Sequence, residues 1–361
     1  MNTRPILKCT LAAACAATVL TAANAIPAED WLAVGRQAAM LSLGMDRPQE
    51  SMAMLEEWIL DEPIETPTTT TVAVPTVGQA QVRPAQTQVT SSGAVTIPEG
   101  GGTVQTKQLS AGSTFVKGVA IKNNSKQAVD IEAALARPLT MSLDSEAQEP
   151  QVLITHTHTT ECYLEHDDGT YASNDPTRTD DPEKNMVAVG EALAAQLRMA
   201  GVQVIHDTTI HDQPYTGAYG HSKASVQQLL AQYPTIRVVL DLHRDAIYPN
   251  DTTRIKPTVV INGKKAAQVM IIVGMLNTSS SPNPHVKENL TFGARLQQQL
   301  HTDYPGLMRP LNLANGRFNQ QLNDGMLLLE MGSDANTLEE ALYAAELVGQ
   351  GLVQVLCNKG E

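Results

Sequence analysis

The second half of the chain alternates short apolar runs with segments whose apolar residues recur at every third or fourth position. Such runs are typical of buried strands, and the recurring spacing is typical of helices. Strands are predicted over Val116–Ile121, Val152–Ile154, Val202–Ile205, Ile236–Leu242, Thr258–Ile261, Gln268–Gly274 and Met326–Leu329. Helices are predicted over Ile131–Ala136, from Pro182 to Gly201, over Val226–Tyr233, over Asn289–Leu300 and from Thr337 to Val355. This alternation predicts an α/β fold, with a mostly parallel sheet covered by helices on both faces.

Capping and turn residues support several of these boundaries. Asp130 can cap the short helix that follows it, and Thr337 with Glu340 forms the capping-box pattern. The pair Asn262-Gly263 is a strong signal for a hairpin turn. We therefore expect the strand-like runs on either side of this pair to form a hairpin.

The first residues of the chain predict export from the cytosol. Arg4 and Lys8 precede an uncharged run, Cys9–Ala25, which ends in the small-x-small pattern Ala23-Asn24-Ala25. This pattern is typical of a signal peptide over residues 1–25, cut after Ala25. The run also approaches the length that an uncleaved membrane anchor needs. Either interpretation places the rest of the chain outside the cytosol, in the membrane-associated or the secreted state.

The next two segments differ from the α/β part in composition. Residues 26–61 hold two short amphipathic patterns and predict a small helical juxtamembrane segment. Residues 62–113 are rich in Thr, Pro, Gln, Val and Gly, a composition that buries too little apolar surface to offset the entropy of ordering. We expect a flexible linker there, followed by a single domain over residues 114–361.

Charge and cysteine content exclude several classes of protein. The 361 residues include 25 Lys and Arg against 38 Asp and Glu, so the net charge is −13. This balance argues against nucleic acid as the main partner, since phosphate binding needs clustered basic residues. Four cysteines are too few for a disulfide scaffold. Cys162 and Cys357 would remain after the export segment, with no support for a bond between them.

Polar side chains follow three of the predicted strands. They are His156–Glu161, Asp241–Asp245 and Glu330. In parallel α/β folds, substrates and cofactors bind at the carboxyl ends of the strands. We therefore expect these side chains to lie close together at that edge of the sheet. Two histidines and one carboxylate suit zinc and leave one position open for water. A lone histidine after a strand is more often a simple hydrogen-bonding residue, so the prediction depends on the combination.

Several stretches together resemble a known family. VLITHTHTTECY, HDTTIHDQPYTGAYGHSKASV, VVLDLHRDA, ENLTFGARLQQQL, GRFNQQL and LLLEMGSDANTLEEA are similar, in order, to stretches of stage II sporulation protein P. The resemblance implies a zinc amidase (phosphorylase/hydrolase-like) fold. It also implies a zinc-dependent N-acetylmuramoyl-L-alanine amidase, a cell-wall hydrolase that cuts the amide joining muramic acid to L-alanine. The family is further credited with cleaving peptide cross-links.

The resemblance also implies a set of metal ligands. His243, in the DLHRD motif, is the zinc ligand that it supports best. His158 is the choice for the second histidine, with His156 as the alternate. Glu161 is the choice for the carboxylate, with Glu183 as the alternate, because Glu183 opens a predicted helix as a ligand glutamate does in the wider zinc amidases.

Other residues receive roles in catalysis or substrate binding. Glu330 resembles the catalytic glutamate of zinc amidases. Arg244 either binds a substrate carboxylate or oxyanion, or pairs with the neighbouring Asp245. Asn319 lies in a family-like stretch and is a candidate for substrate binding.

The resemblance implies partners, while other functions stay open. The implied partners are peptidoglycan and the stage II sporulation proteins D and M, during septal wall remodelling and engulfment in a sporulating cell. One alternative is a non-catalytic module that binds peptidoglycan or a partner on the same fold. Another is a zinc carboxypeptidase or deacetylase that acts on a different cell-wall bond.

Overall fold

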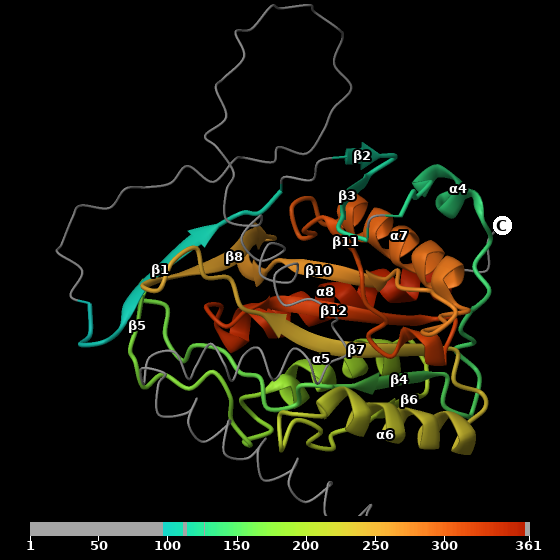
Figure 1. The fold of residues 1–361 in the computed structure, drawn as a ribbon, viewed down its shortest axis with the longest axis horizontal. Helices are drawn as coiled ribbons and strands as arrows, with labels where there is room; N and C mark the ends of the chain where they lie inside the picture. The colour runs from blue at the N-terminus through green and yellow to red at the C-terminus, as the bar shows by residue number, and fades with distance from the viewer. Residues whose placement is uncertain (1–96, 111–113, 126, 358–361) are drawn as a thin grey trace, which may run out of the picture. The chain divides into compact units, whose positions relative to one another are not determined.

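The computed structural model describes residues 97–110, 114–125 and 127–357 (Figure 1). The predicted export segment over residues 1–25, the predicted helical segment over residues 26–61 and most of the predicted linker lie outside these residues. The helices within the described ranges were searched for a membrane span, and none has the length and apolarity that a span requires.

The described residues form two sheets and five α-helices. The larger sheet contains β2 (Thr114–Val116), β3 (Val119–Asn123), β4 (Val152–Thr155), β6 (Val204–His206), β7 (Val238–Asp245), β10 (Val269–Gly274), β11 (Leu311–Ala314) and β12 (Met326–Ser333). The smaller sheet contains β1 (Gly102–Lys107), β5 (Thr170–Tyr171), β8 (Thr253–Ile261) and β9 (Lys264–Ala267). The helices are α4 (Ile131–Ala136), α5 (Met186–Met199), α6 (Ala218–Gln232), α7 (Val286–Asp303) and α8 (Leu338–Leu356), with a 3-10 turn η2 (Gln320–Leu322).

The larger sheet is mostly parallel, as predicted. Its strand order is β2-β3-β11-β10-β12-β7-β4-β6. Strands β6, β4, β7 and β12 run in one direction, and β10 pairs with β12 in the opposite direction. The carboxyl ends of β4, β7 and β12 therefore lie side by side at one edge of the sheet (Figure 1).

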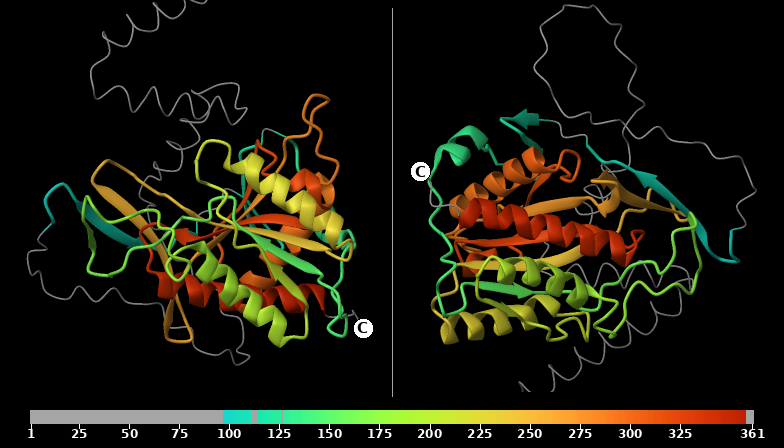
Figure 2. Two further views of the ribbon diagram at one scale, coloured as in Figure 1. Left: turned by 90° about the horizontal axis from the view of Figure 1, so that it is seen from below. Right: turned by 180° about the vertical axis from the view of Figure 1, so that it is seen from behind.

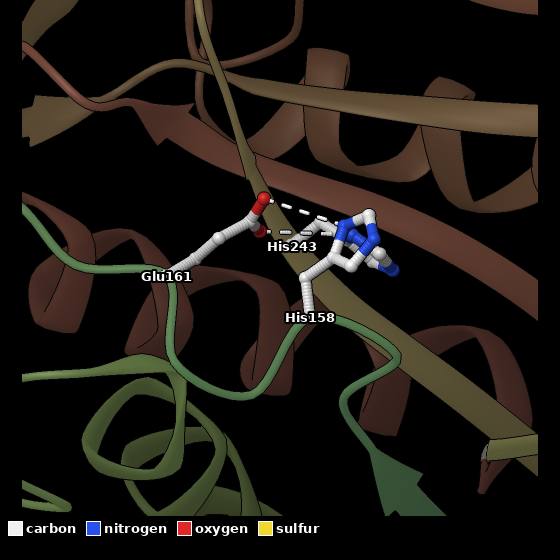
Figure 3. Close-up of side chains that lie close together, drawn as sticks. All are labelled: His158, Glu161 and His243. Carbon is white, nitrogen blue, oxygen red and sulfur yellow. Dashed lines mark ion pairs between the residues drawn. The ribbon is translucent and has the colours of Figure 1, made fainter. Parts of the chain in front are cut away.

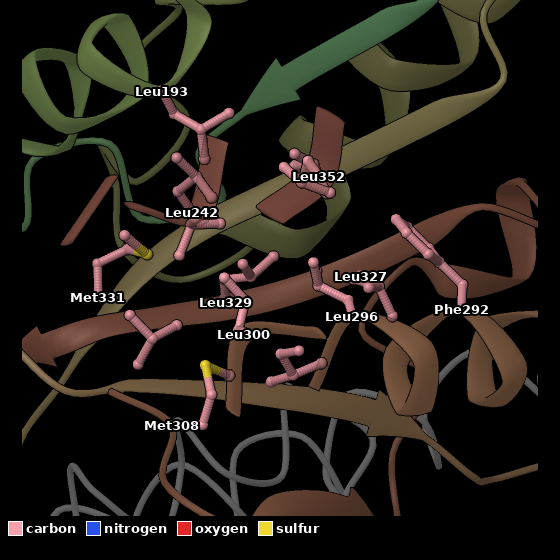
Figure 4. Packing of buried hydrophobic residues seen from close by; sticks show 14 of the residues in the cluster. Leu193, Leu242, Phe292, Leu296, Leu300, Met308, Leu327, Leu329, Met331 and Leu352 are labelled. Atoms are coloured by element: carbon pink, nitrogen blue, oxygen red, sulfur yellow. The ribbon is translucent and has the colours of Figure 1, made fainter. Parts of the chain in front are cut away.

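Helices pack on both faces of this sheet, which confirms the predicted α/β architecture (Figure 2). Val238, Leu240 and Leu242 of β7 join the large apolar cluster that α5, α7 and α8 share (Figure 4). Val239 joins a smaller cluster with Val226 of α6. Since successive side chains of a strand point to opposite faces, α6 covers the face opposite to α5 and α8.

The predicted linker boundary at residue 113 is wrong for residues 102–107. These residues form β1, which pairs with β8 on one side and with β5 on the other. The composition argument fails here because neighbouring strands supply hydrogen-bond partners to a segment that contains little apolar surface of its own. The other described residues of the predicted linker, 97–101 and 108–110, form no helix or strand.

Two other elements differ in extent from the prediction, one because of a helix cap and one because of a turn. Helix α5 begins at Met186 and not at Pro182, because the side chain of Asn185 caps it by accepting the Val187 N–H. The strand predicted over Val116–Ile121 is a hairpin of β2 and β3, which reverses direction at Lys117-Gly118 with positive φ angles.

The Asn262-Gly263 turn is present, but it joins β8 to β9 and not to the run over Gln268–Gly274. That run becomes β10, a central strand of the other sheet. The predicted Asp130 cap of α4 and the capping box of Thr337 and Glu340 at α8 are both confirmed.

Candidate functional site

Three of the predicted residues, His158, Glu161 and His243, come together at the carboxyl ends of β4 and β7 (Figure 3). Each offers one ligand atom, and these atoms lie within 4.8 Å of one another. Nδ1 of His158 is 3.4 Å from Oε1 of Glu161, and Nδ1 of His243 is 3.7 Å from Oε2 of Glu161. One carboxylate thus faces both imidazoles.

The alternation of β7 and β12 places the side chains of the site on one face of the sheet. Val239 faces α6, so Asp241 and His243, two and four residues later, point to the same face. Met326 of β12 also packs in the α6 cluster, and Glu330 follows it by four residues. His243 and Glu330 are register partners in the parallel pairing of β7 and β12. Glu330 is therefore next to the metal-binding candidates, inside its strand and not beyond its end.

The other two candidates lie on a tight turn after β4. The Glu161 N–H donates to the His158 carbonyl at 3.2 Å, and the Thr159 hydroxyl donates to the His156 carbonyl at 2.9 Å. The Glu161 carboxylate in turn accepts the backbone N–H of Arg244, at 3.2 Å. The turn is thereby tied to β7 next to His243.

The Asp241 carboxylate, which hydrogen bonds hold in place, lies beside His243. Oδ1 of Asp241 lies 3.1 Å from Nε2 of His243 and also accepts the Thr157 N–H. Oδ2 of Asp241 accepts the Thr157 hydroxyl at 2.6 Å, and that hydroxyl is 2.7 Å from the hydroxyl of Ser222 on α6. His243 thus has the Asp241 carboxylate facing Nε2 and Glu161 facing Nδ1. A metal-binding histidine typically has a carboxylate at its other ring nitrogen in this way.

The charges around the cluster favour the ionised form of Glu161, which is the form that binds a metal. Burial by itself would raise the pKa of this carboxyl, but Arg244, His158 and His243 hold that pKa well below its usual range. The Arg178 guanidinium adds an ion pair with Glu161 at 3.3 Å. Glu161 is therefore ionised at neutral pH, as a metal ligand must be.

The pKa values of His243 and Glu330 are raised, in contrast to that of Glu161. Burial would lower the pKa of His243, but the Asp241 carboxylate raises that pKa to about 9. Burial, followed by the nearby Asp245 carboxylate, raises the pKa of Glu330 to about 8. Oε2 of Glu330 is shielded from solvent and has no hydrogen-bond partner within the described residues. A carboxyl group with such a pKa can both accept and return a proton near neutral pH.

The donor set fits a transition metal better than a hard cation. It consists of two imidazoles and one carboxylate, whereas calcium and magnesium prefer oxygen ligands throughout. Zinc accepts nitrogen and oxygen ligands, and three protein ligands leave its fourth tetrahedral position for water or substrate. The residues present therefore suit a catalytic zinc site.

The two alternate ligands lie elsewhere. His156 points to the other face of the sheet, where its Nε2 is 2.9 Å from Nε2 of His206 and its Nδ1 donates to the Leu242 carbonyl. Burial, followed by the charge of His206, lowers the pKa of His156 to about 3. Glu183 is exposed in the turn before α5. Neither is brought into the cluster.

The two candidates for substrate binding are engaged within the protein. Arg244 is buried, and its guanidinium donates to the carbonyls of Cys162 and Thr177. It does not pair with Asp245, whose carboxylate lies 2.8 Å from Nη2 of Arg309. The Asn319 amide donates to the Tyr219 carbonyl and to the Ser222 hydroxyl, both on α6. Arg244 also pairs with the candidate ligand Glu161, with Nη1 4.0 Å from Oε1. Both side chains are thus held by contacts within the protein.

Three residues beside the cluster were not predicted. Tyr215 stacks on His158, Tyr219 contacts the rings of both histidines, and Arg178 binds Glu161. The two tyrosines lie in a stretch that resembles the family, but nothing in the sequence places them against His158. Arg178 lies in an irregular loop, where no periodicity could have located it.

Comparison with known proteins gives a family match over most of the chain. Residues 80–352 match the family described as Stage II sporulation protein P (SpoIIP). The chain is also 31% identical over 206 residues to stage II sporulation protein P of Bacillus subtilis strain 168, which covers 54% of this chain and 48% of that protein. The match thus spans about half the length of that relative.

Solved structures with some similarity include two amidases. An N-acetylmuramyl-L-alanine amidase from Mycobacterium smegmatis is 14% identical and has a TM-score of 0.34, covering 59% of this chain and 99% of that one. An N-acetylmuramoyl-L-alanine amidase from Clostridium difficile 630 is 14% identical and has a TM-score of 0.33, covering 59% of this chain and 100% of that one.

Proposed function

Because the chain belongs to the stage II sporulation protein P family, we propose that it is a zinc-dependent peptidoglycan hydrolase that cuts the amide between N-acetylmuramic acid and L-alanine. The observation that carries this proposal is the convergence of His158, Glu161 and His243 next to Glu330, at the carboxyl ends of adjacent strands. Two imidazoles and a carboxylate would hold zinc, and a second carboxyl group lies beside them to handle protons.

The chemistry follows from the position and pKa of each group. His158, Glu161 and His243 would hold zinc, which would supply Lewis-acid chemistry by acidifying water and polarising the carbonyl of the amide. Glu330 accepts a proton from the attacking water and returns it to the nitrogen that leaves as the amine of L-alanine. His158, Glu161 and His243 stay fixed during this exchange, because the turn after β4 and the Asp241 network hold them. Proton transfer by a positioned carboxyl group typically contributes about 10²–10⁴-fold to the rate.

The proposal includes a place and partners for this activity. The uncharged run before Ala25 directs the domain outside the cytosol, cleaved or anchored, where peptidoglycan is found. Stage II sporulation proteins D and M are the partners that family membership suggests, during septal wall remodelling and engulfment. Residues 62–96 are the proposed linker between the membrane side and the catalytic domain.

Product analysis on purified peptidoglycan tests the function. We expect the full chain, supplied with zinc, to release stem peptides that begin with L-alanine, as identified by mass spectrometry. A chelator is expected to stop the release, and added zinc to restore it. Products cleaved within the peptide cross-links would show that the protein also has endopeptidase activity. Release of D-alanine or of acetate would instead indicate the carboxypeptidase or deacetylase. Binding without any soluble product, at every zinc concentration, would indicate the non-catalytic module and contradict the proposal.

A further inference from the structure

Two of the three proposed zinc ligands lie on a turn, and a second loop holds that turn in place. His243 belongs to β7, whereas His158 and Glu161 come after β4 has ended. The loop between β6 and α6 is hydrogen-bonded to the turn through several groups. Nδ1 of His211 donates to the His156 carbonyl at 3.0 Å, and the Asp212 carboxylate accepts the hydroxyl of Thr160 at 2.6 Å. The backbone of the turn is therefore fixed from outside.

The same loop brings Tyr215 against one of the ligands. The rings of Tyr215 and His158 are stacked, with their centroids 5.0 Å apart and an interplanar angle of 18°. The Arg178 guanidinium lies over the Tyr215 ring, 4.8 Å from its centroid, and also pairs with Glu161. Tyr215 thus contacts His158 directly and Glu161 through Arg178.

The side chain of His158 needs this contact more than that of His243 does. His243 has the Asp241 carboxylate at its second nitrogen, whereas His158 contacts Glu161 and the rings of Tyr215 and Tyr219. Tyr215 is nevertheless 48% exposed, although a tyrosine that served only the core would be covered. The position of Tyr215 is explained by its stacking on the His158 ring.

We propose that Tyr215 is a positioning residue that holds the His158 imidazole in its metal-binding orientation by ring stacking. This inference rests on the proposed zinc site and adds a residue that does not touch the metal. Tyr215 contacts His158 and Arg178 through its aromatic ring, so the ring carries the effect and the hydroxyl does not. Partners of metal ligands typically change metal affinity by about 10–100-fold when they are removed.

Zinc affinity of Tyr215 variants tests this inference in the full chain. We expect Tyr215→Ala to weaken zinc binding about 10–100-fold in competition with a chromogenic chelator. Tyr215→Phe is expected to bind zinc as the wild type does. The melting temperature of the metal-free protein should be the same in all three proteins, since Tyr215 is half exposed. Phe115→Ala is the matched control: Phe115 is 60% exposed and contacts His301 from β2, at the opposite end of the sheet from β4 and β6.

The outcomes separate this inference from the function it rests on. Wild-type affinity in Tyr215→Ala would overturn the positioning role while leaving the zinc site intact. Equal losses in Tyr215→Ala and Tyr215→Phe would also overturn it, since the hydroxyl would then carry the effect. A fall of the metal-free melting temperature in Tyr215→Ala that accounts for the lost affinity would reduce Tyr215 to a structural residue. A wild-type chain that binds no zinc would overturn the proposed function together with the inference.

Discussion

Glu330→Gln is expected to lower the rate of amide hydrolysis by about 10²–10⁴-fold and to leave the bound zinc unchanged. Gln has nearly the same shape as Glu but cannot accept a proton from water. Glu330 lies in register with the candidate ligand His243, and the structure places it outside the cluster of ligand atoms. Its loss should therefore affect proton transfer and not metal binding.

Rates and zinc content of the purified variant would be measured together. Glu132→Gln on α4 serves as a control, since that glutamate is exposed and pairs with Lys117. Unchanged turnover in Glu330→Gln would remove Glu330 from the mechanism. Loss of zinc together with turnover would instead make Glu330 a ligand.

His243→Ala is expected to abolish hydrolysis and to weaken zinc binding by more than the roughly 10–100-fold that loss of a ligand's partner causes. The substitution removes one of the three donors. It also leaves the buried Asp241 carboxylate without the imidazole that lies 3.1 Å from it. Chelator competition on the variant measures the affinity directly.

A second histidine variant shows whether the effect is specific to the cluster. His156→Asn keeps a donor for the Leu242 carbonyl on the other face of the sheet, and we expect it to retain zinc. If His156→Asn loses zinc and His243→Ala retains it, the assignment of ligands is contradicted.

The sequence predicted most of the larger sheet because its strands are long or strongly apolar. Met326–Leu329 and Ile236–Leu242 were predicted close to their observed positions, and both are central strands. Strand β1 was missed because a polar segment gains its order from pairing with β8 and β5, and not from burial of its own side chains. Pairing between distant segments leaves no local pattern in a sequence.

The site was predicted less completely than the fold. The choice of His158 over His156 rested on a resemblance, and the structure brings His158 and not His156 to Glu161 and His243. The alternation of side-chain direction along β4 does not predict which histidine faces the site. The strand ends at Thr155, and the chain turns before it reaches His158. Tyr215 and Arg178 come from loops that meet the cluster only in the folded chain.

Crystals of the full chain grown with zinc, with anomalous data collected at the zinc edge, test the central claim most directly. The account predicts one zinc peak about 2.0–2.2 Å from a nitrogen of His158, a nitrogen of His243 and an oxygen of Glu161. A peak bonded to His156 or Glu183, or no peak at this cluster in protein that degrades peptidoglycan, would contradict it.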